Sequence, residues 1–297
     1  MRSCVGANAS SADDQSDVAK KVESKGGEAA FYSSPSCPFY KYPKGSLSCY
    51  GDEATPLLHS IARQGKDFHL DTFAEDFFTW AKGYHGRLNH MSKEFVSNRD
   101  AGKSWDKCAS GSKDAHNLIK IPIIAARWAG TPDYMTKVEQ ITQLHQYEPI
   151  ATVVARVCAR IYEKVLLGAT PKGAFEAVLS DGSSPPDERA VLEKAKSKQG
   201  EPYPKAVKEL GLSCALPGSG EAALLSLLVF DGYHAAVEGN ILAAGDNCSR
   251  SLLLAGVFAA ASGADFVPSS WQHKTTALPE LTKSIDAVVD LNPALSE

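Results

Sequence analysis

Residues 149–168 read PIATVVARVCARIYEKVLLG and carry the strongest helical signal in the chain. Large apolar residues recur here every three or four positions, which is the spacing of one face of an α-helix. They are Ile150, Val153, Val154, Val157, Ile161 and Val165. The stretch therefore predicts a long amphipathic helix with a buried face.

Helical patterns continue on both sides of this stretch. Residues 220–230, 233–245 and 246–266 combine Leu with Ala, Gly and Ser, a composition that suits closely packed helices. Toward the N-terminus, residues 57–62 and 73–81 also place apolar side chains at helical spacing. No convincing run of strand-like alternation occurs, so the sequence predicts an all-α fold.

The chain is expected to form one helical domain over residues 31–297, because no internal repeat or change of composition divides it. Residues 1–30 are polar and poor in large apolar side chains. We therefore expect a poorly ordered or shortened N-terminal segment that adds little to the core. Pro122 lies inside another helical pattern and marks either a kink or the first turn of that helix.

The composition argues against nucleic-acid and membrane partners. Lys and Arg number 31 against 35 Asp and Glu, which gives a net charge of −4 and a pI near 6.1. Such a chain has no basic field to attract nucleic acid or anionic lipid. It lacks the run of roughly 18 apolar residues that a membrane span requires, and residues 1–17 contain no apolar core of a signal peptide. We therefore expect a soluble, cytoplasmic protein.

Cysteine and histidine patterns argue against a zinc site. The seven cysteines form no CxxC pair, and the eight histidines form no HExxH motif. A metal in this protein is therefore expected to have oxygen ligands.

Two acidic segments lie where a loop is expected to become a helix. The first is YGDE at residues 50–53, and the second is GDNCSR at residues 245–250. A carboxylate at such a position either caps the helix or offers its oxygens to a ligand, and the residues alone leave both interpretations open.

Three segments together resemble the ADP-ribosylglycohydrolase family. They are PFYKYPKGSLSCYGDEA at 38–54, SGSKDAHNLIKIPIIAARWAG at 110–130 and EGNILAAGDNCSRSLLLAGVFAAASGA at 238–264. The resemblance extends over about residues 30–275 and is greatest to the branch that contains the J-type lens crystallins and selenoprotein J. It implies an orthogonal bundle of many α-helices, in agreement with the helical patterns.

The resemblance also implies a metal-dependent chemistry. Hydrolases of this family hold two Mg²⁺ ions over the ribose of ADP-ribose, with acidic motifs from opposite ends of the chain. Asp52 and Glu53 match the two early acids, Asp246 matches the first late acid, and Ser249 matches the late hydroxyl. By resemblance, Asp52 and Glu53 are the catalytic pair, supplying metal ligand and general base, and Asp246 and Ser249 are further metal ligands.

This sequence departs from the family pattern at two of these positions. Gly51 replaces the early Thr, and Cys248 replaces the second late Asp. A thiol is a poor ligand for Mg²⁺, so one Mg²⁺ site is expected and the second is expected to be weakened or lost. The Gly-Asp and aromatic His-Trp elements of the family's first helix are also missing, so this helix is expected to be shortened or replaced.

Five residues are candidates for contact with an ADP-ribosyl ligand: Asp114, His116, Asn117, Tyr50 and Arg250. Each has a structural alternative. The loop at residues 114–117 would equally cap the next helix, and the Tyr50 ring would equally pack in its loop. Arg250 either forms an exposed ion pair with Asp246 or occupies the space of a cation.

The resemblance thus implies a hydrolase of ADP-ribosyl glycosidic bonds with a degenerate Mg²⁺ site, and its expected partner is ADP-ribose or an ADP-ribosylated substrate. The alternative is a catalytically inactive protein of the same fold. Such a protein would be structural, in the manner of a crystallin, or would bind ADP-ribose or a nucleotide. The replacements at Gly51 and Cys248 and the missing elements of the family's first helix favour this alternative.

Overall fold

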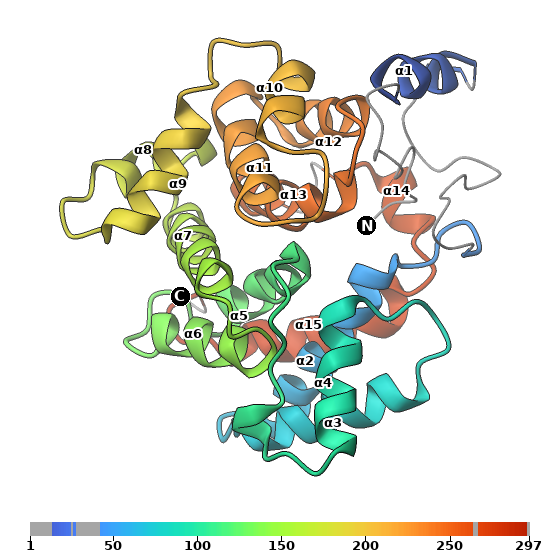
Figure 1. Ribbon diagram of the computed structural model, residues 1–297, viewed down its shortest axis with the longest axis vertical. Coiled ribbons are helices and arrows are strands. Elements are labelled where there is room, and N and C mark those ends of the chain that lie inside the picture. The colour runs from blue at the N-terminus through green and yellow to red at the C-terminus, as the bar shows by residue number, and fades with distance from the viewer. Residues whose placement is uncertain (1–13, 25, 28–41, 264–266, 296–297) are drawn as a thin grey trace.

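The apolar periodicity of residues 149–168 produces helix α7 (Pro149–Leu166) in the computed structural model of the chain (Figure 1). Pro149 occupies the first turn, where its missing amide hydrogen costs nothing. Of the apolar face, Val154, Val157, Ile161 and Val165 are buried, and Ile150 and Val153 are partly buried. The structure describes residues 14–24, 26–27, 42–263 and 267–295, and the statements below concern these residues.

The other described residues form further α-helices and two short 3-10 helices, with no β-strand among them. In chain order these are α1 (Asp14–Ser24), α2 (Cys49–Gln64), α3 (Leu70–Gly83), α4 (His90–Asp100), η1 (Trp105–Lys107), η2 (Ala115–Lys120), α5 (Ile121–Trp128), α6 (Tyr134–His145), α8 (Pro171–Ser180), α9 (Pro186–Lys196), α10 (Tyr203–Leu210), α11 (Gly218–Val229), α12 (Tyr233–Leu242), α13 (Asn247–Ser262), α14 (Ser269–His273) and α15 (Leu278–Asp290). The all-α class is therefore confirmed. None of these helices has the length and apolar character needed to cross a membrane.

Helix α7 contacts its neighbours in sequence, α5, α6, α8 and α9, and also α13 in the C-terminal part of the chain. Figure 1 shows α10 to α13 gathered on one side of the structure and α2, α3, α4 and α15 on the other. One continuous cluster of buried apolar side chains extends from Val18 in α1 to Val288 in α15. A smaller apolar cluster lies between α10, α11 and α12, around Tyr203 and Leu225.

The small residues of α13 allow α7 to approach it closely. Tyr162 of α7 donates its hydroxyl to the carbonyl oxygen of Leu253 at 3.2 Å. A Cβ atom at Gly256 would lie 1.8 Å from that hydroxyl oxygen, so the contact requires glycine. The Ala, Gly and Ser pattern of this segment therefore reflects close packing between helices.

Helix α1 contradicts part of what was expected of residues 1–30. Val18 and Val22 are buried in the main core, and the Gln15 amide donates to the carbonyl oxygens of Pro204 and Ala243 at 2.7 and 3.1 Å. The expectation that this segment adds little to the core is wrong for α1, because its two valines belong to the main core and the helix contacts α12. Residues 1–13 lie outside the described residues.

The segment that contains Pro122 forms two helices rather than one. The 3-10 helix η2 ends at Lys120, and Pro122 lies in the first turn of α5. Pro122 was expected to mark either a kink or the first turn of a helix, and the structure places it in the first turn. Asp114 precedes η2, but its side chain makes no capping hydrogen bond.

Candidate functional site

The first turn of α2 begins earlier than the apolar periodicity indicates. Ser48 is the cap residue, and its hydroxyl oxygen accepts the amide hydrogen of Gly51 at 3.3 Å. Because the helix starts at Cys49, Asp52 and Glu53 lie inside it. The capping interpretation of Asp52 is therefore wrong, and both carboxylates are available for other contacts.

Asp246 caps helix α13. Its Oδ1 accepts the amide hydrogen of Ser249 at 3.1 Å, and its Oδ2 accepts the Ser249 hydroxyl at 2.9 Å. The negative charge also lies at the positive end of the helix dipole. Asp246 and Ser249 thus bind each other within the first turn.

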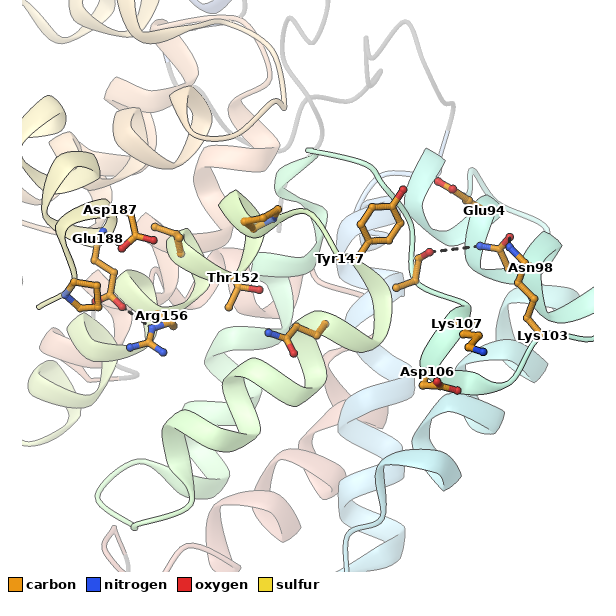
Figure 2. Close-up of a pocket in the computed structure, with 15 residues that line it drawn as sticks. Glu94, Asn98, Lys103, Asp106, Lys107, Tyr147, Thr152, Arg156, Asp187 and Glu188 are labelled. Atoms are coloured by element: carbon orange, nitrogen blue, oxygen red, sulfur yellow. Dashed lines mark hydrogen bonds and ion pairs between the residues drawn. The ribbon is translucent and has the colours of Figure 1, made fainter.

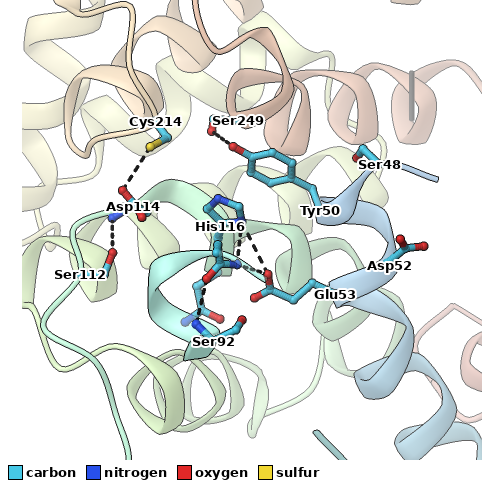
Figure 3. Close-up of polar contacts among 12 residues, drawn as sticks. Ser48, Tyr50, Asp52, Glu53, Ser92, Ser112, Asp114, His116, Cys214 and Ser249 are labelled. Carbon is cyan, nitrogen blue, oxygen red and sulfur yellow. Dashed lines mark hydrogen bonds and ion pairs between the residues drawn. The ribbon is translucent and has the colours of Figure 1, made fainter. Parts of the chain in front are cut away.

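Tyr50 joins the two helix starts. Its hydroxyl donates to Asp246 Oδ2 at 2.7 Å and lies 2.9 Å from Ser249 Oγ. Its ring stacks on His116 of η2, with centroids 3.9 Å apart and an interplanar angle of 9° (Figure 3). Burial and the neighbouring Asp246 carboxylate hold the pKa of Tyr50 well above its usual value, so the phenol stays a donor. The structure therefore brings Tyr50, His116, Asp246 and Ser249 together.

Glu53 is enclosed by further polar side chains, and His116 links it to Tyr50. It is 2% exposed, and its Oε2 accepts a hydrogen bond from the Asn89 amide. His116 Nδ1 lies 3.5 Å from the same oxygen, and Lys120 Nζ lies 3.7 Å from Oε1. Burial raises the pKa of Glu53, but the hydrogen bond from His116 and the charge of Lys120 outweigh it, and the net pKa is lowered. Glu53 is thus an anion inside the protein.

Lys120 and Asn89 are site residues that sequence reasoning missed. Lys120 is 0% exposed and donates to Asn117 Oδ1 at 2.7 Å, while the Asn117 amide donates to the carbonyl oxygen of Thr142 at 2.8 Å. Burial lowers the pKa of Lys120 to about 8, which leaves it charged at neutral pH. The available signal was one lysine inside the apolar run Leu118–Ile124. Both polar ends of Asn117 make hydrogen bonds inside the protein, and Asn117 as a ligand contact stays a prediction.

Asp52 points away from Glu53 (Figure 3). Its Oδ2 accepts the hydroxyl of Tyr84 at 2.6 Å, and the Tyr84 and Tyr42 hydroxyl oxygens lie 3.0 Å apart. Burial raises the pKa of Asp52, and the hydrogen bond from Tyr84 opposes this rise. The two adjacent acids therefore belong to different networks.

The loop before η2 contributes Asp114, which is half-buried. Its Oδ1 accepts the thiol of Cys214 at 3.1 Å (Figure 3), and its backbone bridges Ala215. This contact ties the loop to the segment before α11. Asp114 as a ligand contact stays a prediction.

Arg250 is 0% exposed, which makes the expected surface ion pair with Asp246 wrong. Its Nε donates to Asn240 Oδ1 at 2.6 Å, and its Nη2 binds the carbonyl oxygens of Asn240 and Ala244. The guanidinium thus satisfies carbonyl groups at the end of α12, where the helix dipole favours a positive charge.

A groove of about 800 Å³ lies between α4, α7 and the start of α9 (Figure 2). Tyr147, Lys107, Arg156 and Glu188 are among the residues that line it. The lining contains none of the residues predicted for the site. The groove and the acidic helix starts are therefore separate features of the molecule.

Comparison with known proteins identifies the family. The sequence model of the ADP-ribosylglycohydrolase family matches residues 9–295. The chain belongs to this family. Two similar proteins from Tripedalia cystophora, crystallin J1A and crystallin J1B, are 23% and 22% identical to it over 261 and 253 residues. These alignments cover 83% and 80% of this chain and 80% and 77% of the two crystallins.

A solved structure supports the same fold. It is described as an ADP-ribosylglycohydrolase-related protein complex and aligns with a TM-score of 0.64 at 15% identity. The alignment covers 84% of this chain and 83% of that chain. The helical bundle expected from the sequence is therefore confirmed as an ADP-ribosylglycohydrolase fold.

The family implies Mg²⁺, yet the acidic residues of this ADP-ribosylglycohydrolase family member do not fit a metal in their present arrangement. Tyrosine hydroxyls bind an oxygen of Asp52 and of Asp246, while an amide and an ammonium group lie at Glu53. A Mg²⁺ ion needs such oxygens turned toward it in octahedral geometry. Within the described ranges, no three His, Cys, Asp or Glu side chains form a group that could hold a metal ion.

Proposed function

We propose that this protein is a non-hydrolytic member of the ADP-ribosylglycohydrolase family with a structural role, as the crystallin name of its relatives suggests. One observation carries the proposal: the acids at the family's metal positions are hydrogen-bonded or ion-paired to the chain itself. In this arrangement they hold helices together. The cytoplasmic location and the absence of a nucleic-acid partner stay predictions from composition.

The burial of Glu53 supports the proposal. A general base must reach a water molecule or a substrate proton within hydrogen-bond distance. Glu53 is 2% exposed and already binds Asn89, so it reaches neither without rearrangement. Tyr50 and Ser249 similarly use the Asp246 oxygens.

A thermal-shift titration of the purified protein with ADP-ribose, with and without Mg²⁺, tests this proposal. A ligand that binds only the folded state raises the melting temperature, by an amount that grows with concentration. We expect no Mg²⁺-dependent shift, and no release of ADP-ribose from an ADP-ribosylated peptide in a parallel turnover assay. A Mg²⁺-dependent shift together with turnover would overturn the proposal.

The second candidate function is recognition or hydrolysis of an ADP-ribosyl group, and Asp52 favours it. This carboxylate is half-buried, and burial raises its pKa, which are common properties of a general acid or base. The expected single Mg²⁺ site stays a prediction that the same titration tests. If turnover occurs, Asp52→Asn should abolish it, while Asp187→Asn in the separate groove should leave it unchanged.

A further inference from the structure

Lys120 places a positive charge inside the acidic site. Its side chain is wholly buried at the end of η2, 3.7 Å from Glu53 Oε1, and its Nζ lies 5.3 Å from the ring centre of Phe77. Lysine is rarely buried without a partner, because the ammonium loses its hydration. Glu53 is the carboxylate that the structure pairs with it.

Glu53 depends on this ammonium in turn. Its Oε1 is buried and makes no hydrogen bond within the described chain, and the Lys120 Nζ at 3.7 Å is the cation paired with that oxygen. The other oxygen binds the uncharged Asn89 amide and lies near His116. Removing the cation that pairs with a buried carboxylate strongly destabilises the folded protein.

We propose that the Lys120 ammonium balances the charge of Glu53 in place of a divalent metal ion in this site. A metal ion would have to lie 2.0–2.6 Å from a carboxylate oxygen, and near Oε1 it would meet the positive charge of Lys120. The ammonium therefore both neutralises Glu53 and repels a metal.

The inference yields a test on the purified chain with metal ions alone. Lys120→Ala removes the charge and leaves space beside Glu53. We expect this variant to have a lower melting temperature than the wild type and to regain stability with millimolar Mn²⁺ or Ca²⁺. At a metal concentration about 100 times Kd, the ratio of folded to unfolded variant should rise about 100-fold. The wild type should not respond.

Two further variants control for the loss of a lysine and for poor folding. Lys137 lies over the Phe68 and Trp128 rings at 5.8 and 5.9 Å, so Lys137→Ala removes a comparable ring contact without affecting Glu53. It should show no metal response. The double variant Glu53→Gln with Lys120→Ala removes both charges. Its melting temperature should be higher than that of Lys120→Ala and should not change when metal is added.

Three results would each overturn the inference. The first is a folded Lys120→Ala variant that no divalent ion stabilises. The second is a double variant no more stable than Lys120→Ala, which decides the matter even if the single variant unfolds. The third is stoichiometric Mn²⁺ binding by the wild type. Turnover of an ADP-ribosylated peptide without metal would instead refute the proposed structural function and leave this inference intact.

Discussion

Replacing Tyr50 by Phe tests whether the polar cluster supports the fold. The substitution removes a buried hydroxyl that donates to the Asp246 carboxylate at 2.7 Å and keeps the ring that stacks on His116. A hydrogen bond to a charged group contributes about 1.5–3 kcal/mol to stability. Asp246 is half-buried and partly regains water, so the lower end applies, and we expect a loss of about 1.5 kcal/mol.

The loss should appear in urea unfolding as a lower midpoint at unchanged slope. In a thermal scan it corresponds to about 2–3 °C, since the entropy of unfolding scales with chain length. A double-mutant cycle with Asp246→Asn should give a coupling of about 1 kcal/mol. Tyr147→Phe is the control, because this side chain is 62% exposed. An unchanged or raised stability of Tyr50→Phe would refute the reasoning and would favour a site kept for ligands at the expense of stability.

Three further predictions concern the rest of the fold. Gly256→Ala should lose about 2 kcal/mol in urea unfolding, because the new Cβ meets the Tyr162 hydroxyl, whereas Gly182→Ala, with open space around it, should stay within about 0.5 kcal/mol. Burial raises the pKa of Cys158 from 9.0 to about 12, so the thiol of the unfolded chain ionises first and the free energy of unfolding falls from pH 9 upward. In Cys158→Ala this fall should be smaller by about 1.4 kcal/mol per pH unit. Equal pH dependence in the variant and the wild type would contradict the assignment. Glu188→Gln should cost about 2 kcal/mol, nearly independent of NaCl, because this buried carboxylate binds two arginines; a loss that salt erases would show a surface pair instead.

The sequence predicted those parts of the fold that depend on local spacing. The apolar positions of α7 lie within one helix, so their periodicity alone locates the buried face. The Leu, Ala and Gly composition of α13 likewise predicts close packing, which the contact between Gly256 and Tyr162 bears out. The start of α2 escaped this approach, because Ser48 caps the helix several residues before its apolar pattern becomes visible.

The site could be predicted only as a set of positions, because its contacts join distant parts of the chain. The family resemblance indicated Asp52, Glu53, Asp246 and Ser249, but not that separate networks bind the two adjacent acids. Lys120 is distant from Glu53 in sequence and lies in an apolar run, so spacing gives no sign of the pair. For Arg250 the residues alone left an exposed ion pair and the space of a cation open. Its burial depends on the contact with Asn240 of α12, which spacing does not predict.

The bond between Tyr50 and Asp246 also sets an order of events during protein synthesis. The two residues are 196 positions apart, and a ribosome adds about 5–20 residues per second, so α2 is made about 10–40 s before α13. Throughout that interval Tyr50 has no Asp246 to bind. Helix α7, once it has been made, has no α13 to pack against until the end of the interval. The chain must therefore pass through a long-lived state with exposed apolar helix faces, in which it is most prone to aggregate and most in need of chaperones.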